Sequence, residues 1–340
     1  MKMKMLMINR EEADRIFEKL SQSYKIIAPV KKIGKGRLSN TDLLAYDEVS
    51  SFKEIEFFNK TYFSAKEVLF PTREDLFEFN KNHIDEIREL ALPWIVFLRA
   101  CDINAIRVMD AHFLNNGGYK DKYYKERRDR VKFFLIECRE PFENCFCVSM
   151  GANKTEDYSG FMRKIDDGYE IKVKDDELLG YLSGGREKDV EPVFVERDKE
   201  PIDLPGEIDT SLFESDMWKE YSSRCSACGR CNTSCPTCTC FTMQDILSDE
   251  GDGGGKRRRI WSSCQVKNFA VLAGKHDFRV HKGDRMRYKV LHKIRDFKKL
   301  AGFNMCVGCG RCDDVCPDYI SMFKCIEKIN KIAGRNLGDG

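Results

Sequence analysis

The chain has 340 residues, of which 42% are hydrophobic and 34% charged, and a formal net charge of +2. This length accommodates two domains, and the composition excludes an intrinsically disordered chain. The longest apolar run, around residues 92–98, is far too short to span a bilayer, and the apolar residues after Met1 are too few for a secretory signal. We therefore expect a soluble cytoplasmic protein with reduced thiols.

The first ninety residues predict one helix and several strands. Asn9 and Glu12 have the spacing of a capping box, so a helix is expected over residues 9–23. Residues 24–30 are typical of a strand, which Pro29 should keep short or place at a sheet edge. Aromatic and β-branched residues between turn signals predict further short antiparallel strands at residues 43–49 and 57–69.

The next hundred residues alternate between strands and a helix. Residues 94–98 and 131–136 are compact apolar runs that predict strands. Asp102 is expected to cap a helix that ends at Leu114. Residues 169–173 alternate between apolar and polar side chains, which predicts a strand with one exposed face. A segment with two prolines then indicates a linker at residues 200–206.

Two cysteine motifs dominate the C-terminal part, which holds 12 of the 16 cysteines. Both motifs have the spacing C-x2-C-x2-C-x3-C-P, which is the bacterial-type pattern for [4Fe-4S] ligation. Three thiolates spaced three residues apart let a short loop surround three corners of a cube, and the proline after the fourth cysteine ends that loop. The candidate ligands of two clusters are Cys225, Cys228, Cys231, Cys235, Cys306, Cys309, Cys312 and Cys316.

Structural zinc, disulfides and buried free thiols are the alternatives to iron–sulfur clusters. Zinc sites usually have two separated cysteine pairs, and disulfides need an oxidising compartment, so the doubled motif favours clusters. In proteins with this spacing the fourth cysteine usually ligates the other cluster. If each motif gives its fourth cysteine to the other cluster, one cluster has the ligands Cys225, Cys228, Cys231 and Cys316, and the other has Cys306, Cys309, Cys312 and Cys235. The alternative is that each cluster is ligated by the four consecutive cysteines of one motif.

The fold class follows from these segments. The chain between the two motifs is not rich in strand signals, and apolar residues at helix spacing predict a helix over residues 285–300. We therefore expect an α+β protein. A mixed α/β N-terminal domain would occupy residues 1–205, and a mainly helical ferredoxin-like domain with two [4Fe-4S] motifs would occupy residues 206–340.

Three further cysteines, Cys238, Cys240 and Cys264, follow the first motif. They are candidate ligands of a third cluster, with Cys325 as a less certain fourth ligand. The favoured alternative is that they pack near the clusters as small apolar side chains. The iron content decides between these hypotheses, because two cubanes hold about eight irons per chain and three hold about twelve.

The remaining reactive side chains give no sign of a substrate-converting site. Cys138, Cys145 and Cys147 match no ligation spacing, so core or loop packing is favoured over a metal site or a redox disulfide. His112 is expected to pack within its helix, and the other four histidines are expected to face solvent. No nucleophile elbow, H-E-x-x-H motif or catalytic carboxylate pair is present. We therefore expect a relay between two partners, with no catalytic site of its own.

Positive charge is concentrated between the two motifs. Residues 256–299 hold 15 Lys or Arg and 3 Asp or Glu. Such a segment is compatible with nucleic-acid binding, with docking to an acidic partner or with internal ion pairs. Few aromatic residues are interleaved and no nucleic-acid-binding motif is visible, so docking or internal pairing is favoured.

The two motifs and the segment between them resemble the iron–sulfur electron-transfer subunit of anaerobic sulfite reductase. The resemblance is dense over residues 225–325 and weaker over residues 138–151. It rests on the run Cys235-Pro-Thr-Cys-Thr-Cys240, on Arg257-Arg-Arg-Ile-Trp-Ser-Ser-Cys264 and on the second motif. The β subunits of soluble sulfhydrogenases are wider kin that share the Cys-Pro-x-Cys-x-Cys run.

This resemblance implies a role in carrying electrons to a sulfite reductase. The chain would pass electrons from a flavin-bearing, NADH-oxidising partner to a sirohaem partner that reduces sulfite to sulfide. The eight motif cysteines would be cluster ligands, and sulfite would bind elsewhere in the complex. One alternative is the iron–sulfur β subunit of a soluble [NiFe] sulfhydrogenase. Another, of a different class, is a cysteine-rich zinc or nucleic-acid-binding module. Neither a membrane nor a nucleic-acid partner is expected.

Overall fold

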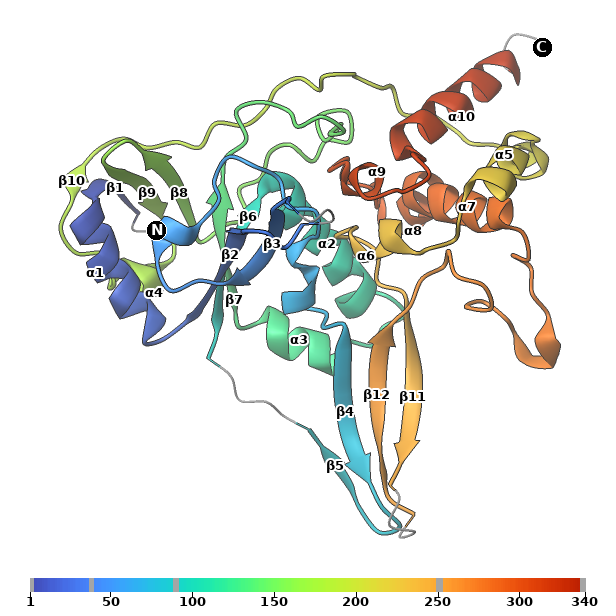
Figure 1. The fold of residues 1–340 in the computed structure, drawn as a ribbon, viewed down its shortest axis with the longest axis horizontal. Coiled ribbons are helices and arrows are strands. Elements are labelled where there is room, and N and C mark those ends of the chain that lie inside the picture. The colour runs from blue at the N-terminus through green and yellow to red at the C-terminus, as the bar shows by residue number, and fades with distance from the viewer. Residues whose placement is uncertain (1–2, 37–39, 88–91, 249–252, 337–340) are drawn as a thin grey trace.

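A computed structural model of the protein describes residues 3–36, 40–87, 92–248 and 253–336 (Figure 1). Its main sheet has the strand order β10-β1-β9-β8-β7-β6-β2-β3. The central strands β2, β6, β7 and β8 run parallel, and the outer strands pair antiparallel with their neighbours. The strands are β1 (Lys4–Asn9), β2 (Lys25–Lys32), β3 (Leu43–Glu48), β6 (Trp94–Arg99), β7 (Val131–Ile136), β8 (Gly160–Ile165), β9 (Gly168–Val173) and β10 (Arg186–Glu187).

Helices cover both faces of the main sheet because its central strands are apolar on both sides. Phe97 and Phe134 belong to the core beneath α1, whereas Leu98 and Phe133 belong to the core beneath α2. The predicted capping box at the start of α1 is confirmed. The helices of this part are α1 (Arg10–Ser21), α2 (Ala100–Leu114), α3 (Lys122–Arg128) and α4 (Asp176–Leu179).

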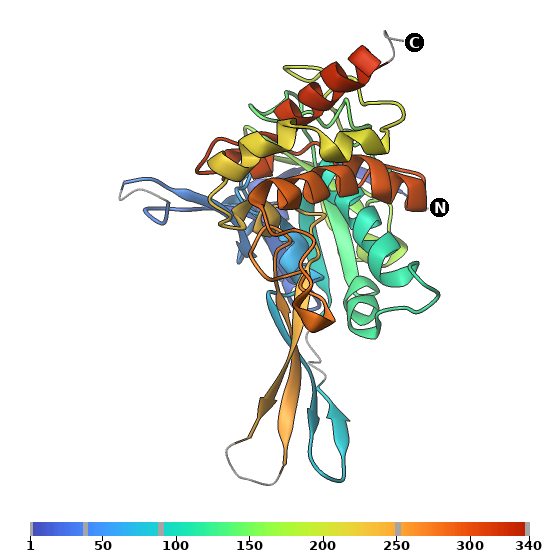
Figure 2. The ribbon, with the colours of Figure 1, turned by 90° about the vertical axis from the view of Figure 1, so that its right-hand side faces the viewer.

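A second sheet projects from the body as an arm (Figures 1 and 2). Its strand order is β11-β12-β4-β5, and β12 pairs antiparallel with β4. The arm therefore joins strands from both sides of residue 205. It also corrects our expectation of few strands between the cysteine motifs, where a hairpin is present. The strands are β4 (Arg73–Phe79), β5 (Ile84–Glu86), β11 (Phe241–Leu247) and β12 (Gly255–Trp261).

Helices surround the two cysteine motifs. The helix predicted over residues 285–300 is confirmed, because α7, a π-helical turn (His292–Asp296) and α8 follow one another without a break. The C-terminal part thus combines helices with a long hairpin and is not mainly helical. Its helices are α5 (Met217–Arg224), α6 (Arg230–Thr233), α7 (Lys282–Leu291), α8 (Phe297–Ala301), α9 (Arg311–Asp314) and α10 (Met322–Asn336). No helix of the described residues is long and apolar enough to cross a membrane.

Two expected strands differ from the prediction. Residues 57–69 contain no strand and end in a 3-10 helix, η2 (Ala65–Val68). β2 lies inside the sheet, not at its edge. Its pairing with β6 ends at Ile27, so Pro29 has β3 as its ladder neighbour and its missing N–H costs no bond to β6.

The alternation in residues 169–173 was wrongly interpreted as an exposed face. Every residue of β9 is buried. The polar positions are tolerated because they form ion pairs within the fold: the Glu170 carboxylate contacts Arg163 and Lys188, and the Lys172 ammonium lies 2.5 Å from Glu191. The polar residues of this alternating pattern therefore form buried ion pairs and do not face solvent.

The histidine predictions were partly confirmed. His112 stacks on Phe297 with ring centroids 5.6 Å apart, and burial lowers its pKa. His83, His276 and His281 are exposed. His292, however, is half-buried against Tyr288, and burial lowers its pKa to about 4, so it does not face solvent freely.

Candidate iron–sulfur site

The two cysteine motifs have the same local geometry. In each Cys-Gly-Arg-Cys turn the glycine is in the left-handed region, with φ of 74° at Gly229 and 70° at Gly310. Each glycine immediately precedes a one-turn helix, α6 or α9, which carries the third cysteine of its motif. α6 and α9 contact each other, so the two motifs meet although they are far apart in the sequence.

Cysteines of both motifs line one enclosed cavity. Cys306, Cys309 and Cys312 of the second motif face it together with Cys235 of the first. These four cysteines are one of the two ligand sets that are predicted if each motif gives its fourth cysteine to the other cluster. Phe146, Val307 and Met322 form the apolar part of its lining, and Lys289, Lys293 and Gly310 also face it.

The first motif lies against the end of the second. The Ser226 N–H donates to the Asp318 carboxylate at 2.7 Å, and the Arg224 guanidinium donates to the carbonyls of Asp318 and Tyr319 at 3.2 Å. Cys316 directly precedes this segment, and its Sγ accepts the Ile320 N–H at 3.3 Å. Cys316 is therefore held at the loop that begins with Cys225.

Three buried lysines bring positive charge to the cysteines. Lys293 is 3% exposed, and its ammonium donates to Cys235 Sγ at 3.4 Å and to Thr237 Oγ1 at 2.7 Å. Burial by itself disfavours the charged form, but the neighbouring cysteines, Cys235 foremost, hold the pKa of Lys293 above its usual value. Lys289 lies in the same way near Cys231 and Cys312. Some of the basic side chains between the two motifs are therefore buried beside the cysteines and do not face solvent.

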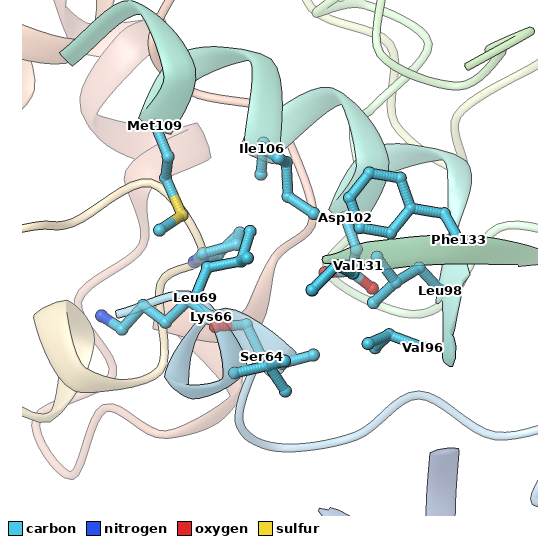
Figure 3. Close-up of a pocket in the computed structure, with 14 residues that line it drawn as sticks. Ser64, Lys66, Leu69, Val96, Leu98, Asp102, Ile106, Met109, Val131 and Phe133 are labelled. Atoms are coloured by element: carbon cyan, nitrogen blue, oxygen red, sulfur yellow. The ribbon is translucent and has the colours of Figure 1, made fainter. Parts of the chain in front are cut away.

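Lys66 reaches the first motif from the N-terminal part of the chain. Its ammonium donates to the carbonyls of Asn232 and Cys238, each at 2.8 Å, and lies 4.2 Å from the centre of the Trp261 ring. Figure 3 shows Lys66 at the border of a small apolar cavity, with its nitrogen directed away from Ile106 and Val96. Burial lowers the pKa of Lys66.

The donor set fits anionic iron–sulfur clusters. A buried ammonium without a counter-charge is costly, and cluster-bound thiolates supply that negative charge. Free thiols supply it only in part, because burial raises the pKa of Cys306 to about 11 and that of Cys309 to about 12, whereas the hydrogen bond with Cys238 and the charge of Lys293 lower the pKa of Cys235. Iron binding therefore displaces protons and leaves thiolates beside the lysines. Within the described residues, no three His, Cys, Asp or Glu side chains are grouped as ligands of a single metal ion.

The additional cysteines divide into two groups. Cys264 is buried, and its Sγ accepts from the Asn232 amide at 3.0 Å and the Gln265 amide at 3.6 Å. Cys240 lies beside Cys264, and this neighbour raises the pKa of the Cys240 thiol. Cys325 instead donates to the Tyr221 hydroxyl at 2.9 Å, in the core between α5 and α10. It therefore has a packing role and is unsuited as a fourth ligand.

The segment from Cys138 to Gly151 supports the second motif. The Phe146 N–H donates to the Gly308 carbonyl at 2.8 Å, and the Cys145 thiol donates to the Cys309 carbonyl at 3.3 Å. Cys145 and Cys147 are buried. Packing, the favoured interpretation, thus describes these thiols, but their contact with the cluster loop could not be predicted because it joins residues 164 positions apart.

An ion pair fixes the second motif to the main sheet. Arg311 is 1% exposed, and its guanidinium donates to both oxygens of the Asp102 carboxylate, at 2.6 and 3.0 Å. It also donates to the Thr61 carbonyl at 3.0 Å. Asp102 lies in the first turn of α2 and does not cap it. The preference of aspartate for helix N-termini predicted that Asp102 would cap this helix. Its side chain instead pairs with Arg311, which lies 209 residues further along the chain.

We expect Gly308→Ala to destabilise the second motif by about 2–4 kcal/mol. Gly308 has φ of 63°, and a Cβ there would lie 2.4 Å from the Phe146 carbonyl oxygen. Ala227, at the equivalent place in the first motif, tolerates φ of 58°, so crowding is the main cause of the loss. Gly151→Ala is the control, since Gly151 has φ of 66° with nothing within 4 Å of its Cβ position. Denaturant unfolding of both variants measures the difference; equal losses would contradict the role of crowding.

Comparison with known proteins agrees with this site. Residues 224–320 match the model of the 4Fe-4S dicluster domain family, which spans both motifs. The whole chain is similar to the sulfhydrogenase 2 subunit beta of Pyrococcus furiosus, with 27% identity over 97% of this chain and 99% of that protein. No solved structure is significantly similar to this chain. The match to a dicluster domain indicates two [4Fe-4S] clusters in the C-terminal part.

Proposed function

We propose that this chain is the electron-transfer subunit of a cytoplasmic oxidoreductase complex. The observation that carries the proposal is the enclosed cavity where Cys235 of the first motif joins Cys306, Cys309 and Cys312 of the second, beside buried Lys293. Each [4Fe-4S] cluster supplies one-electron chemistry when bound. The protein residues hold the thiolates, exclude water and offset negative charge, which are the tasks of a relay.

In this proposal the fourth cysteine of each motif ligates the cluster that the other motif holds. One cluster would be held by Cys306, Cys309, Cys312 and Cys235, because these side chains face one cavity. The other would be held by Cys225, Cys228, Cys231 and Cys316, a set that the hydrogen bonds of Arg224 and Ser226 with residues 318–319 support.

We expect Cys235→Ser and Cys309→Ser to remove the same cluster. Each variant should lower the iron content of anaerobically purified protein from about eight to about four per chain. The remaining electron paramagnetic resonance spectrum of the reduced protein should be identical in the two variants. Cys228→Ser is the control, because it removes the other cluster and leaves the complementary spectrum. Identical spectra from Cys235→Ser and Cys228→Ser would instead establish consecutive ligation.

The terminal partner has two candidates. Similarity to a sulfhydrogenase beta subunit over nearly the full length of both chains supports a partner that contains a nickel–iron centre. The resemblance of the motif segment to the electron-transfer chain of anaerobic sulfite reductase supports a sirohaem partner that reduces sulfite to sulfide. In both complexes electrons would enter from a flavin protein that oxidises a nicotinamide. Affinity purification from the native cell, followed by metal and haem analysis, distinguishes them: nickel supports the first and sirohaem the second.

A third cluster remains part of the proposal as a separate question. Cys240 lies beside Cys264, whereas Cys238 lies beside Cys235 of the first motif. Amide donors from Asn232 and Gln265 would stabilise a thiolate at Cys264. An iron content of about twelve per chain supports this site. A content of about eight, unchanged in Cys264→Ser, leaves these three as packing residues.

A further inference from the structure

The two Cys-Gly-Arg-Cys turns differ in their exposure to solvent. Cys228 and Arg230 of the first turn are exposed. Cys309 and Arg311, which occupy the same places in the second turn, are 6% and 1% exposed. Electron tunnelling between two proteins falls steeply with distance, so a partner must approach one of the clusters closely. The first turn is open to such an approach, whereas the second is enclosed by the protein.

Positive charge lies on one side of the first turn. Arg230 directly follows Gly229 within the turn. Lys267 is exposed and follows Val266, whose Cγ1 lies 3.5 Å from the position that a Cβ of Gly229 would occupy. Among the ion pairs between described residues, none includes Arg230 or Lys267. Both charges are therefore free to face a partner.

Lys282 brings a third positive charge to the other side of the turn. The Ser226 N–H donates to the Asp318 carboxylate at 2.7 Å, and this bond, together with the charge of Lys282, lowers the pKa of Asp318. Lys282 also forms no ion pair in the part of the chain that the structure describes. Tyr319, which follows Asp318, is 87% exposed. Positive charge thus lies on both sides of the exposed cysteine.

A loop with exposed apolar side chains connects these two sides. Residues 268–281 lie between Lys267 and Lys282, and Figure 1 shows them in orange within the long loop between β12 and α7. Leu272 and Phe278 of this loop are 57% and 73% exposed. Protein interfaces combine apolar contacts of this kind with a polar, charged rim. The surface around the first turn therefore has the composition of a docking site.

We propose that Cys228, Arg230, Lys267 and Lys282, together with the loop at residues 268–281, form a docking surface for an acidic one-electron carrier protein. Opposite charges would steer the carrier to the turn and orient it there. The same charges would attract a nucleic acid, but the exposed cluster ligand among them favours a redox protein. The inference rests on the relay function proposed above and names the cluster at which the relay meets a partner.

The step at this surface is the transfer of a single electron. The reduced centre of the carrier is oxidised by one electron, and the cluster of the first motif is reduced by one. No bond forms or breaks and no proton moves. The carrier itself is the reductant, so the step needs no further reactant.

Reduction by a plant-type [2Fe-2S] ferredoxin, which is a small acidic protein, tests the proposal. The reduced ferredoxin is mixed rapidly with the full chain, purified anaerobically with its clusters, and the absorbance is followed. Arg230→Glu and Lys267→Glu should each slow cluster reduction about fivefold at low salt, and the differences should vanish at about 0.5 M salt. Lys19→Glu is the matched control, because Lys19 is exposed on α1, which Figure 1 places at the opposite end of the molecule.

Two ligand variants identify the cluster that accepts the electron. Cys309→Ser retains the cluster of the first motif and should be reduced as fast as the unchanged protein. Cys228→Ser retains only the enclosed cluster and should be reduced at least about tenfold more slowly, because the carrier cannot approach that cluster closely.

Three results would overturn the inference: equal rates in the two ligand variants, rates in Arg230→Glu and Lys267→Glu that match Lys19→Glu, or binding of a DNA oligonucleotide as tight as that of the ferredoxin. Iron content and reduction by dithionite are measured in every sample. A protein whose clusters are reduced by dithionite but not by the ferredoxin refutes only this inference. A protein without clusters refutes the relay function itself.

Discussion

Replacing Arg311 by Leu is expected to lower the free energy of unfolding by about 3–5 kcal/mol. The change leaves the Asp102 carboxylate, which is 3% exposed, without its bidentate partner. It also removes the hydrogen bonds to Thr61. Breaking a buried ion pair from one side is costly because the remaining charge has neither water nor a counter-ion.

The first motif supplies the control for this experiment. Arg230 occupies the same place in its Cys-Gly-Arg-Cys turn but is exposed, so Arg230→Leu should change the stability by less than about 0.5 kcal/mol. Urea unfolding of the cluster-loaded protein, followed by circular dichroism under anaerobic conditions, measures both. Equal effects of the two substitutions would contradict the assignment of Arg311 as the link between the cluster motif and the main sheet.

This pair of arginines also shows what the sequence can and cannot predict. The cysteine spacing predicts both turns, because ligation geometry is encoded within twelve consecutive residues. The two motifs carry the same Cys-Gly-Arg-Cys letters, and nothing local distinguishes Arg230 from Arg311. The difference arises from the surface that each motif meets, and α2 with its Asp102 is assembled from a distant part of the chain.

The arm was missed for a related reason. Every residue of β11 is exposed, so it lacks the alternation by which a half-buried strand is recognised. β12 contains four consecutive basic residues, for which docking or internal pairing was the favoured interpretation. Internal pairing is confirmed for Arg259, which is buried and whose guanidinium pairs with Glu74 of β4 and with Asp121. Long-range pairing therefore determines both the strand and the inward direction of its charge.

The second large effect concerns the reduction potential. Lys293→Met is expected to lower the potential of the cluster held by Cys235, Cys306, Cys309 and Cys312 by on the order of 100 mV. An added electron makes that cluster more negative, and the buried ammonium 3.4 Å from Cys235 Sγ stabilises the reduced form. At an effective dielectric constant of about 20 and a charge separation of about 6–7 Å, the lost attraction is about 2.5 kcal/mol. Methionine has a similar length and fills the buried space without a charge.

Lys298→Met is the matched control because Lys298 lies on the same continuous helix but is exposed. Solvent and salt screen its charge, so its removal should shift the potential by no more than about 10 mV. Potentiometric titration followed by electron paramagnetic resonance measures both clusters in each variant. The shift in Lys293→Met should be larger in the cluster that Cys309→Ser eliminates. A shift of equal size in both clusters, or none in either, would contradict the assignment of Lys293 to the cluster held by Cys235, Cys306, Cys309 and Cys312.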